Sequence, residues 1–205
     1  QQISNQLISS NFNLDNDSFD TSYQRDTYLR MGDCHFALKQ YWPAMENYNI
    51  SIALDQKLGA YPNFQKAISY GFVDRNSKKI STLKKIIIDY PNDDLIDDAL
   101  FELALVYSEE KQYKKSISTY DQLISSYEIS PYIGKATLNK GLILYNQEKY
   151  ELAVRVLEDV AISFFKYEIG LQAITTLKEI AIDQGRVKDF NNWIKNNNLN
   201  QFSDI

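Results

Sequence analysis

The sequence contains a single cysteine, Cys34, so no disulfide can form within the chain, and neither a four-thiolate zinc site nor CxxC redox chemistry can be assembled. Seven glycines and four prolines are too few for an all-β protein with many tight turns. The apolar runs, such as 86–88 and 103–107, fall far short of the roughly 20 residues that span a bilayer. These absences favour a helical protein that does not span a membrane.

Basic residues are outnumbered by acidic ones: the chain has 22 Lys and Arg residues and 27 Asp and Glu residues, which gives a net charge of −5. A nucleic-acid partner, which requires a basic face, is therefore disfavoured. The hydrophobic share of 44% is close to the globular average and predicts a folded core. The chain starts at Gln1 without Met or an apolar leader, so we expect a mature product or a piece of something longer.

Internal repetition organises the chain. Three segments open with Tyr and place a small residue three positions later: 41–48, 113–120 and 150–157. Another small residue stands twelve positions before the small residue of each segment, and a weaker copy of this pair lies at positions 67 and 79. The leading small residues, Gly32, Ala67, Ala104 and Gly141, are spaced by 35, 37 and 37 residues. Such a period indicates a repeat architecture.

Each repeat is predicted to be a helix, a short turn and a second helix. Polar breaks separate the two small residues, at 39–40, 74–77, 109–112 and 146–149, and apolar residues on both sides follow three-and-four spacing. Small residues would let the two helices approach closely, while aromatic residues fill the wider spaces. Because one helix pair cannot bury both of its faces, the units are expected to stack with the first helices on the concave side.

This pattern resembles the tetratricopeptide repeat (TPR), which reads W-x2-L-G-x2-Y, then A-x3-F, then P. The first unit carries it at Tyr28, Met31, Gly32, His35, Ala44 and Tyr48. The third carries it at Leu100, Leu103, Ala104, Tyr107, Ser116 and Tyr120, and the fourth at Gly141, Leu144, Ala153 and Leu157. The second keeps Ala67, Tyr70, Leu83 and Pro91. Its Lys79 stands where a small residue is expected, which puts close helix contact in that unit in question.

The resemblance implies an all-α fold, a right-handed α-solenoid of stacked antiparallel helix pairs. The array is expected over 21–198, in units at about 25–59, 60–96, 97–133 and 134–170 with a capping unit at 171–198, whose turn lies at 183–185. Residues 1–20 are expected to be the end of a preceding helix, with Ile3, Leu7 and Ile8 on one face, followed by a polar loop over 11–20. Residues 199–205 would form a C-terminal tail.

A narrower resemblance concerns the cellular setting. The segment 84–93, with its Asp-Tyr-Pro turn, and the following 97–103 are similar to TPR proteins of the bacterial envelope, and the wealth of Asn, Ile, Lys and Tyr is similar to long TPR proteins of Bacteroidetes-type bacteria. That likeness implies the C-terminal part of a longer array, acting as a scaffold in envelope assembly or secretion. The expected location is the periplasm or the outer membrane, in association with outer-membrane proteins, with the cytoplasm as the alternative.

Catalytic equipment is sparse. The only histidine, His35, lies next to Cys34 and about 100° from it around a helix, so the two cannot act as a base and thiol pair, and His35 is expected in the repeat core. No HExxH, GxxxxGK or GxGxxG motif occurs. Acidic residues at 93–94 and 97–98 suit a helix N-terminus without any metal. We therefore expect no enzyme activity, no cofactor and no metal.

The expected binding surface is the stripe one residue after the packing stripe of each first helix. It comprises Leu29, Asp33, Phe36, Phe64, Ile68, Phe72, Phe101, Leu105, Leu138, Leu142 and Tyr145, of which all but Asp33 are proposed as contact residues. A cationic clamp for a partner's C-terminal carboxylate is lacking. Two readings remain open: the stripe packs against itself in a tight superhelix, or it holds a partner helix or extended segment. A glycan-binding role through the 27 aromatic residues is the alternative from another class.

Overall fold

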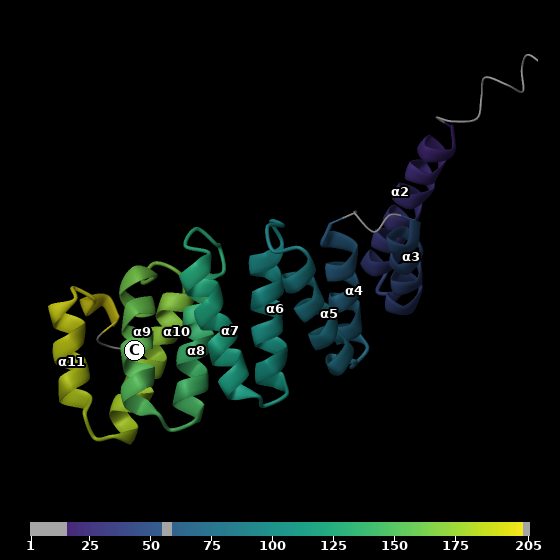
Figure 1. The fold of residues 1–205 in the computed structure, drawn as a ribbon. Helices are drawn as coiled ribbons and strands as arrows, with labels where there is room; N and C mark the ends of the chain where they lie inside the picture. Colours follow the sequence, from purple (N-terminus) through teal and green to yellow (C-terminus); the bar gives the residue numbers. More distant parts are fainter. Residues whose placement is uncertain (1–15, 55–58, 203–205) are drawn as a thin grey trace, which may run out of the picture. The chain divides into compact units, whose positions relative to one another are not determined.

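The structure, a computed structural model, describes residues 16–54 and 59–202. Within these ranges ten α-helices and one 3-10 turn follow one another (Figure 1). They are α2 (Asn16–Ala37), α3 (Tyr41–Leu54), α4 (Tyr61–Phe72), α5 (Asn76–Asp89), α6 (Ile96–Glu109), α7 (Tyr113–Ser126), α8 (Ile133–Asn146), α9 (Tyr150–Ser163), α10 (Glu168–Asp183), α11 (Val187–Asn196) and η1 (Asn200–Phe202). The all-α arrangement of consecutive helix pairs confirms the fold class expected from the repeats.

The chain divides into two compact units, residues 1–99 and 100–205, with the boundary in the first turn of α6. In the first unit α2 packs on α3, α3 on α4 and α4 on α5. In the second unit α7 packs on α8, α8 on α9, α9 on α10, and α10 on both α8 and α11. Helix α2 begins at Asn16, before the expected start at 21, and the apolar face expected over 1–10 lies outside the described residues.

All five helix pairs are joined by the same three-residue turn. Its middle residue has a positive φ in each case: Lys39 (59°), Asp74 (56°), Lys111 (58°), Glu148 (58°) and Gly185 (66°). The residue that follows donates its N–H to the carbonyl five positions earlier, over 2.7–3.0 Å, as from Gln112 to Tyr107. This is the Schellman motif, which satisfies the last carbonyls of the first helix. The backbone turn therefore recurs with the period seen in the sequence.

The small residues make room for large partners. Ser116 donates its hydroxyl hydrogen to the carbonyl of Ala104 at 2.7 Å, so these two small residues meet as expected. The glycine positions work differently: a Cβ on Gly32 would lie 2.5 Å from the Tyr48 ring, and one on Gly141 would lie 2.6 Å from Leu157. Each glycine thus accommodates a large side chain one turn beyond its expected small partner.

The second repeat, formed by α4 and α5, accommodates Lys79 in a similar way. The side chain is buried, and its Cδ would lie 3.1 Å from a Cβ placed on Gly71. Gly71 leaves space for the aliphatic stem of the lysine, as long charged side chains bury their methylenes along apolar surface. The two helices therefore pack although Lys79 stands in place of the second small residue; the first, Ala67, is fully buried.

Candidate functional site

The stripe expected on the first helices divides by burial. Leu29 and Phe101 are each 8% exposed and Leu138 is 3% exposed, so these three belong to the core. Phe72 is 58% exposed, and the remaining members are half-buried. Because only some members are buried, part of the stripe packs internally, while the rest retains surface that a partner can contact.

In the first unit, the exposed end of the stripe is an aromatic cluster. Phe72 from α4 stacks on Tyr41 from α3 with ring centroids 4.5 Å apart and an interplanar angle of 8°. Phe36 from α2 meets both rings edge-on, at 5.7 and 5.9 Å. Three helices thus bring these aromatic side chains together. Phe64 and Ile68, which precede Phe72 in α4, are half-buried. The cluster presents an apolar surface with fixed ring orientations.

Asp33 is committed to internal bonds. Its Oδ1 accepts hydrogen bonds from the hydroxyl groups of Tyr48 at 3.1 Å and Tyr61 at 3.0 Å, while Oδ2 pairs with Arg30 at 3.1 Å. Burial, reinforced by this carboxylate, raises the pKa of both tyrosines. The aspartate therefore ties α2 to α3 and α4.

In the second unit, Phe101 is covered by aromatic neighbours. Its ring stacks on Tyr132 at 4.7 Å and lies 6.0 Å from Tyr120. Leu105, one turn later on α6, is half-buried. The buried Phe101 is a packing residue, and of these two only Leu105 offers surface.

An open groove of about 560 Å³ lies between the first helices α8 and α10. It is lined by Leu142, Tyr145, Asn146, Glu168, Leu171, Gln172, Thr175, Thr176 and Glu179. Leu142 and Tyr145 were expected from the stripe. The α10 residues were missed because that helix was assigned to the cap. The repeat period could have located them, since Thr175 and Glu179 stand 37 positions after Leu138 and Leu142.

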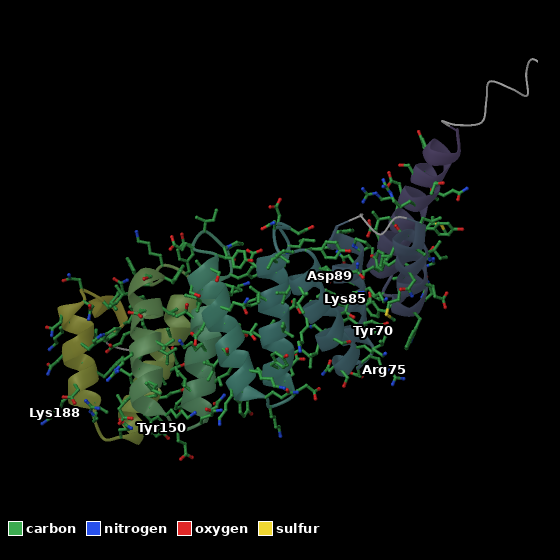
Figure 2. All side chains as sticks on the ribbon, in the orientation of Figure 1. Tyr70, Arg75, Lys85, Asp89, Tyr150 and Lys188 are labelled. Atoms are coloured by element: carbon green, nitrogen blue, oxygen red, sulfur yellow. The ribbon has the colours of Figure 1, made fainter. Side chains whose placement is uncertain are left out.

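Tyr145 stands at one edge of this groove. Its hydroxyl donates to Asp183 Oδ2 at 3.3 Å, and its ring lies 6.0 Å from that of Tyr150, which Figure 2 shows at the start of α9. Desolvation, together with the carboxylates of Asp183 and Glu179, raises the pKa of Tyr145. The hydroxyl thus serves as a hydrogen-bond donor to Asp183 at this edge.

The described residues offer little for catalysis. Cys34 is exposed. His35 is half-buried, and its Nδ1 lies 2.7 Å from Gln40 Oε1. The histidine is therefore less buried than its repeat equivalents Tyr107 and Leu144. Within 16–54 and 59–202 no three His, Cys, Asp or Glu residues are grouped as a metal site. None of the helices in that part of the chain has the length and apolar character to cross a bilayer.

The acidic loop before α6 has a structural task. Asp93 Oδ2 accepts the N–H of Ala60, the residue before α4, at 3.1 Å, and its Oδ1 accepts the N–H of Leu95 at 3.1 Å. Asp93 thus caps α4 from a loop 33 residues away in the sequence. Two of the aromatic residues are structural, since Tyr48 and Tyr120 are fully buried. Among the described residues, the exposed aromatic side chains are Tyr23, Trp42, Phe72 and Tyr167.

Comparisons with known proteins agree with the arrangement of the helices in consecutive pairs. Residues 98–128 match the family model for the tetratricopeptide repeat. No curated protein matches the chain by sequence. Solved structures with a similar fold include MamA, at 14% identity and a TM-score of 0.68, over 86% of this chain and 91% of that one. MamA 41-end from Desulfovibrio magneticus RS-1 is 13% identical, with a TM-score of 0.68 and 85% and 93% coverage.

A eukaryotic structure is similar as well. The nearly identical TPR-like repeats of a putative kinesin light chain from Podosopora anserina share 13% identity, with a TM-score of 0.62 and 86% and 94% coverage. At such identities the likeness shows the fold alone. The chain therefore has a TPR-like fold of consecutive helix pairs. Residues 98–128, in α6 and α7, are its matching tetratricopeptide repeat.

Proposed function

We propose that this protein is a non-catalytic scaffold that holds a helix or extended segment of a partner protein against its first helices. The supporting observation is the open groove between α8 and α10. Leu171 is 41% exposed there and Leu142 is half-buried, so apolar surface lies beside polar side chains that can fix a partner's orientation. Helix-in-groove recognition uses such a combination of apolar contacts and a polar edge.

The aromatic cluster of the first unit is proposed as a separate contact surface. Phe72 retains more than half of its accessible surface although two rings pack against it. Aromatic residues held rigidly by neighbours lose little conformational entropy on binding, which is why they are frequent at the energetic centres of interfaces. Phe101 retains only 8% of its accessible surface, so we do not include it in this proposed surface.

The groove is tested by displaying a library of helical peptides and measuring the affinity of selected peptides by fluorescence anisotropy. Leu171→Asp should weaken binding at least tenfold, because it places a charge in the apolar part of the groove. Leu152→Asp is the matched control: it makes the same change on the second helix α9, where the leucine is 49% exposed. Equal affinities for the two variants would contradict the proposed site.

For the setting, we propose a bacterial envelope, in assembly or secretion and in contact with outer-membrane proteins. The support is the resemblance of segments 84–93 and 97–103 to envelope TPR proteins. Fractionation of the source cells, followed by detection with an antibody against this chain, tests the location. Recovery in the periplasmic or outer-membrane fraction is expected, and recovery with cytoplasmic markers would contradict it.

A further inference from the structure

The groove between α8 and α10 carries negative charge at its margins. Glu168 and Glu179 line it, and Asp183 lies next to Tyr145 through a hydrogen bond. Its lining includes no lysine or arginine. Carboxylates gathered in one groove create a local field of one sign, which attracts cations and repels anions.

These carboxylates are available to a partner. Within the described part of the chain, neither Glu168 nor Glu179 takes part in an ion pair. Two cations of the same unit are engaged elsewhere, since Lys140 pairs with Asp121 at 2.5 Å and Arg186 with Asp189 at 3.0 Å. Neither of these cations lines the groove, and its two glutamates therefore remain available to pair with cations of a bound segment.

From this juxtaposition we propose that the groove takes a basic amphipathic helix of a partner protein, with apolar residues over Leu142 and Leu171 and Lys or Arg facing Glu168 and Glu179. The inference rests on the proposed function and specifies the partner's chemistry. An acidic segment would bring like charges together, which is the arrangement that interfaces use to reject a partner.

Three synthetic helical peptides test the charge requirement. They share one leucine stripe at three-and-four spacing and carry Lys, Gln or Glu at every polar position. The Lys peptide should bind about tenfold more tightly than the Gln peptide at low salt, because surface ion pairs add modest individual energies. Its advantage should shrink as ionic strength rises, since exposed charges are screened. Binding is measured by fluorescence anisotropy against the full chain.

Charge reversal in the groove separates specific from general attraction. Glu168→Lys with Glu179→Lys should weaken the Lys peptide at least tenfold and strengthen the Glu peptide. Glu151→Lys with Asp159→Lys is the control, because both residues are exposed on α9 and the change in net charge is the same. Circular dichroism of each variant verifies that the helices are retained.

The outcomes distinguish this inference from the proposed function. Equal affinities of the Lys and Gln peptides, or equal losses in the groove and control variants, would overturn the basic-partner inference. Tighter binding of the Glu peptide that Leu171→Asp abolishes would also overturn it, while leaving the groove as a binding site. If no peptide binds and library selection yields none that Leu171→Asp weakens, both proposals fail.

Discussion

Replacing Lys39 by Gly should stabilise the protein. Lys39 has a φ of 59° in the turn between α2 and α3, where its side chain is exposed. Holding an L-residue in this left-handed region costs about 1–2 kcal/mol. Glycine avoids that strain but loses more backbone freedom on folding, which costs about 0.5–1 kcal/mol. The difference predicts a net gain of about 0.75 kcal/mol in the free energy of unfolding.

Urea unfolding followed by far-ultraviolet circular dichroism measures this gain. With a dependence of about 2 kcal/mol per molar urea, the midpoint should rise by about 0.4 M. Lys84→Gly is the matched control, because Lys84 is exposed in the interior of α5, within the same compact unit. There glycine should lower stability by about 1 kcal/mol, as in any exposed helix interior. The same substitution therefore has opposite signs at the two sites.

The reciprocal change completes the test. Gly185 has a φ of 66°, and a Cβ added to it would meet no atom within 4 Å, so Gly185→Ala introduces backbone strain without a clash. By the same balance of strain against backbone freedom, it should lower stability by about 0.75 kcal/mol. A fall in the urea midpoint for Lys39→Gly, or no change for Gly185→Ala, would refute the assignment of the left-handed turn.

Five further substitutions, at four sites, probe contacts in the two units, each by urea unfolding. Gly170→Ala should cost about 3 kcal/mol, because its Cβ would lie 2.1 Å from the carbonyl oxygen of Phe164, which is backbone and cannot rotate away. Asp93→Ala should cost about 1 kcal/mol through loss of the α4 cap, whereas Asp93→Glu should restore little because the longer side chain misplaces the oxygen. Asp33→Ala should cost about 2 kcal/mol and Tyr48→Phe about 1 kcal/mol, since only the first leaves a buried hydroxyl without its acceptor. The reverse order would contradict the role given to Asp33.

The repeat could be predicted from the sequence because its period is carried by apolar residues at helical spacing and by polar breaks. The turn geometry could not, since the left-handed position is occupied by Lys39, Asp74, Lys111 and Glu148 before a glycine finally appears at Gly185. Of the first four only Asp74 is a residue type enriched in this conformation, and the two lysines and the glutamate give no such signal. What recurs is a pair of backbone hydrogen bonds, which sequence letters do not reveal.

The candidate site was predicted only in part, for a related reason. A helical stripe shows which residues share a face, but burial depends on what packs over that face. Phe101 and its repeat equivalent Leu138 are both buried, Phe101 beneath Tyr132, whereas Leu142, one turn further along the stripe, opens onto a groove. The polar side of that groove was missed because Thr175 and Glu179 replace leucines in the preceding unit.

The register of the helix pairs depends more on the turn than on the small residues. The position four residues after each turn's last hydrogen-bond donor holds Ala44, Lys79, Ser116, Ala153 and Phe190, which differ greatly in volume, yet all five are buried. A fixed turn brings each of them against the first helix at the same level, and the facing residue adjusts, as Gly71 does for Lys79. Close packing then requires complementary pairs rather than small residues. A chain built in this way can carry different side chains on the helix faces of different repeats. One compact unit can therefore hold an acidic groove and the other an aromatic cluster.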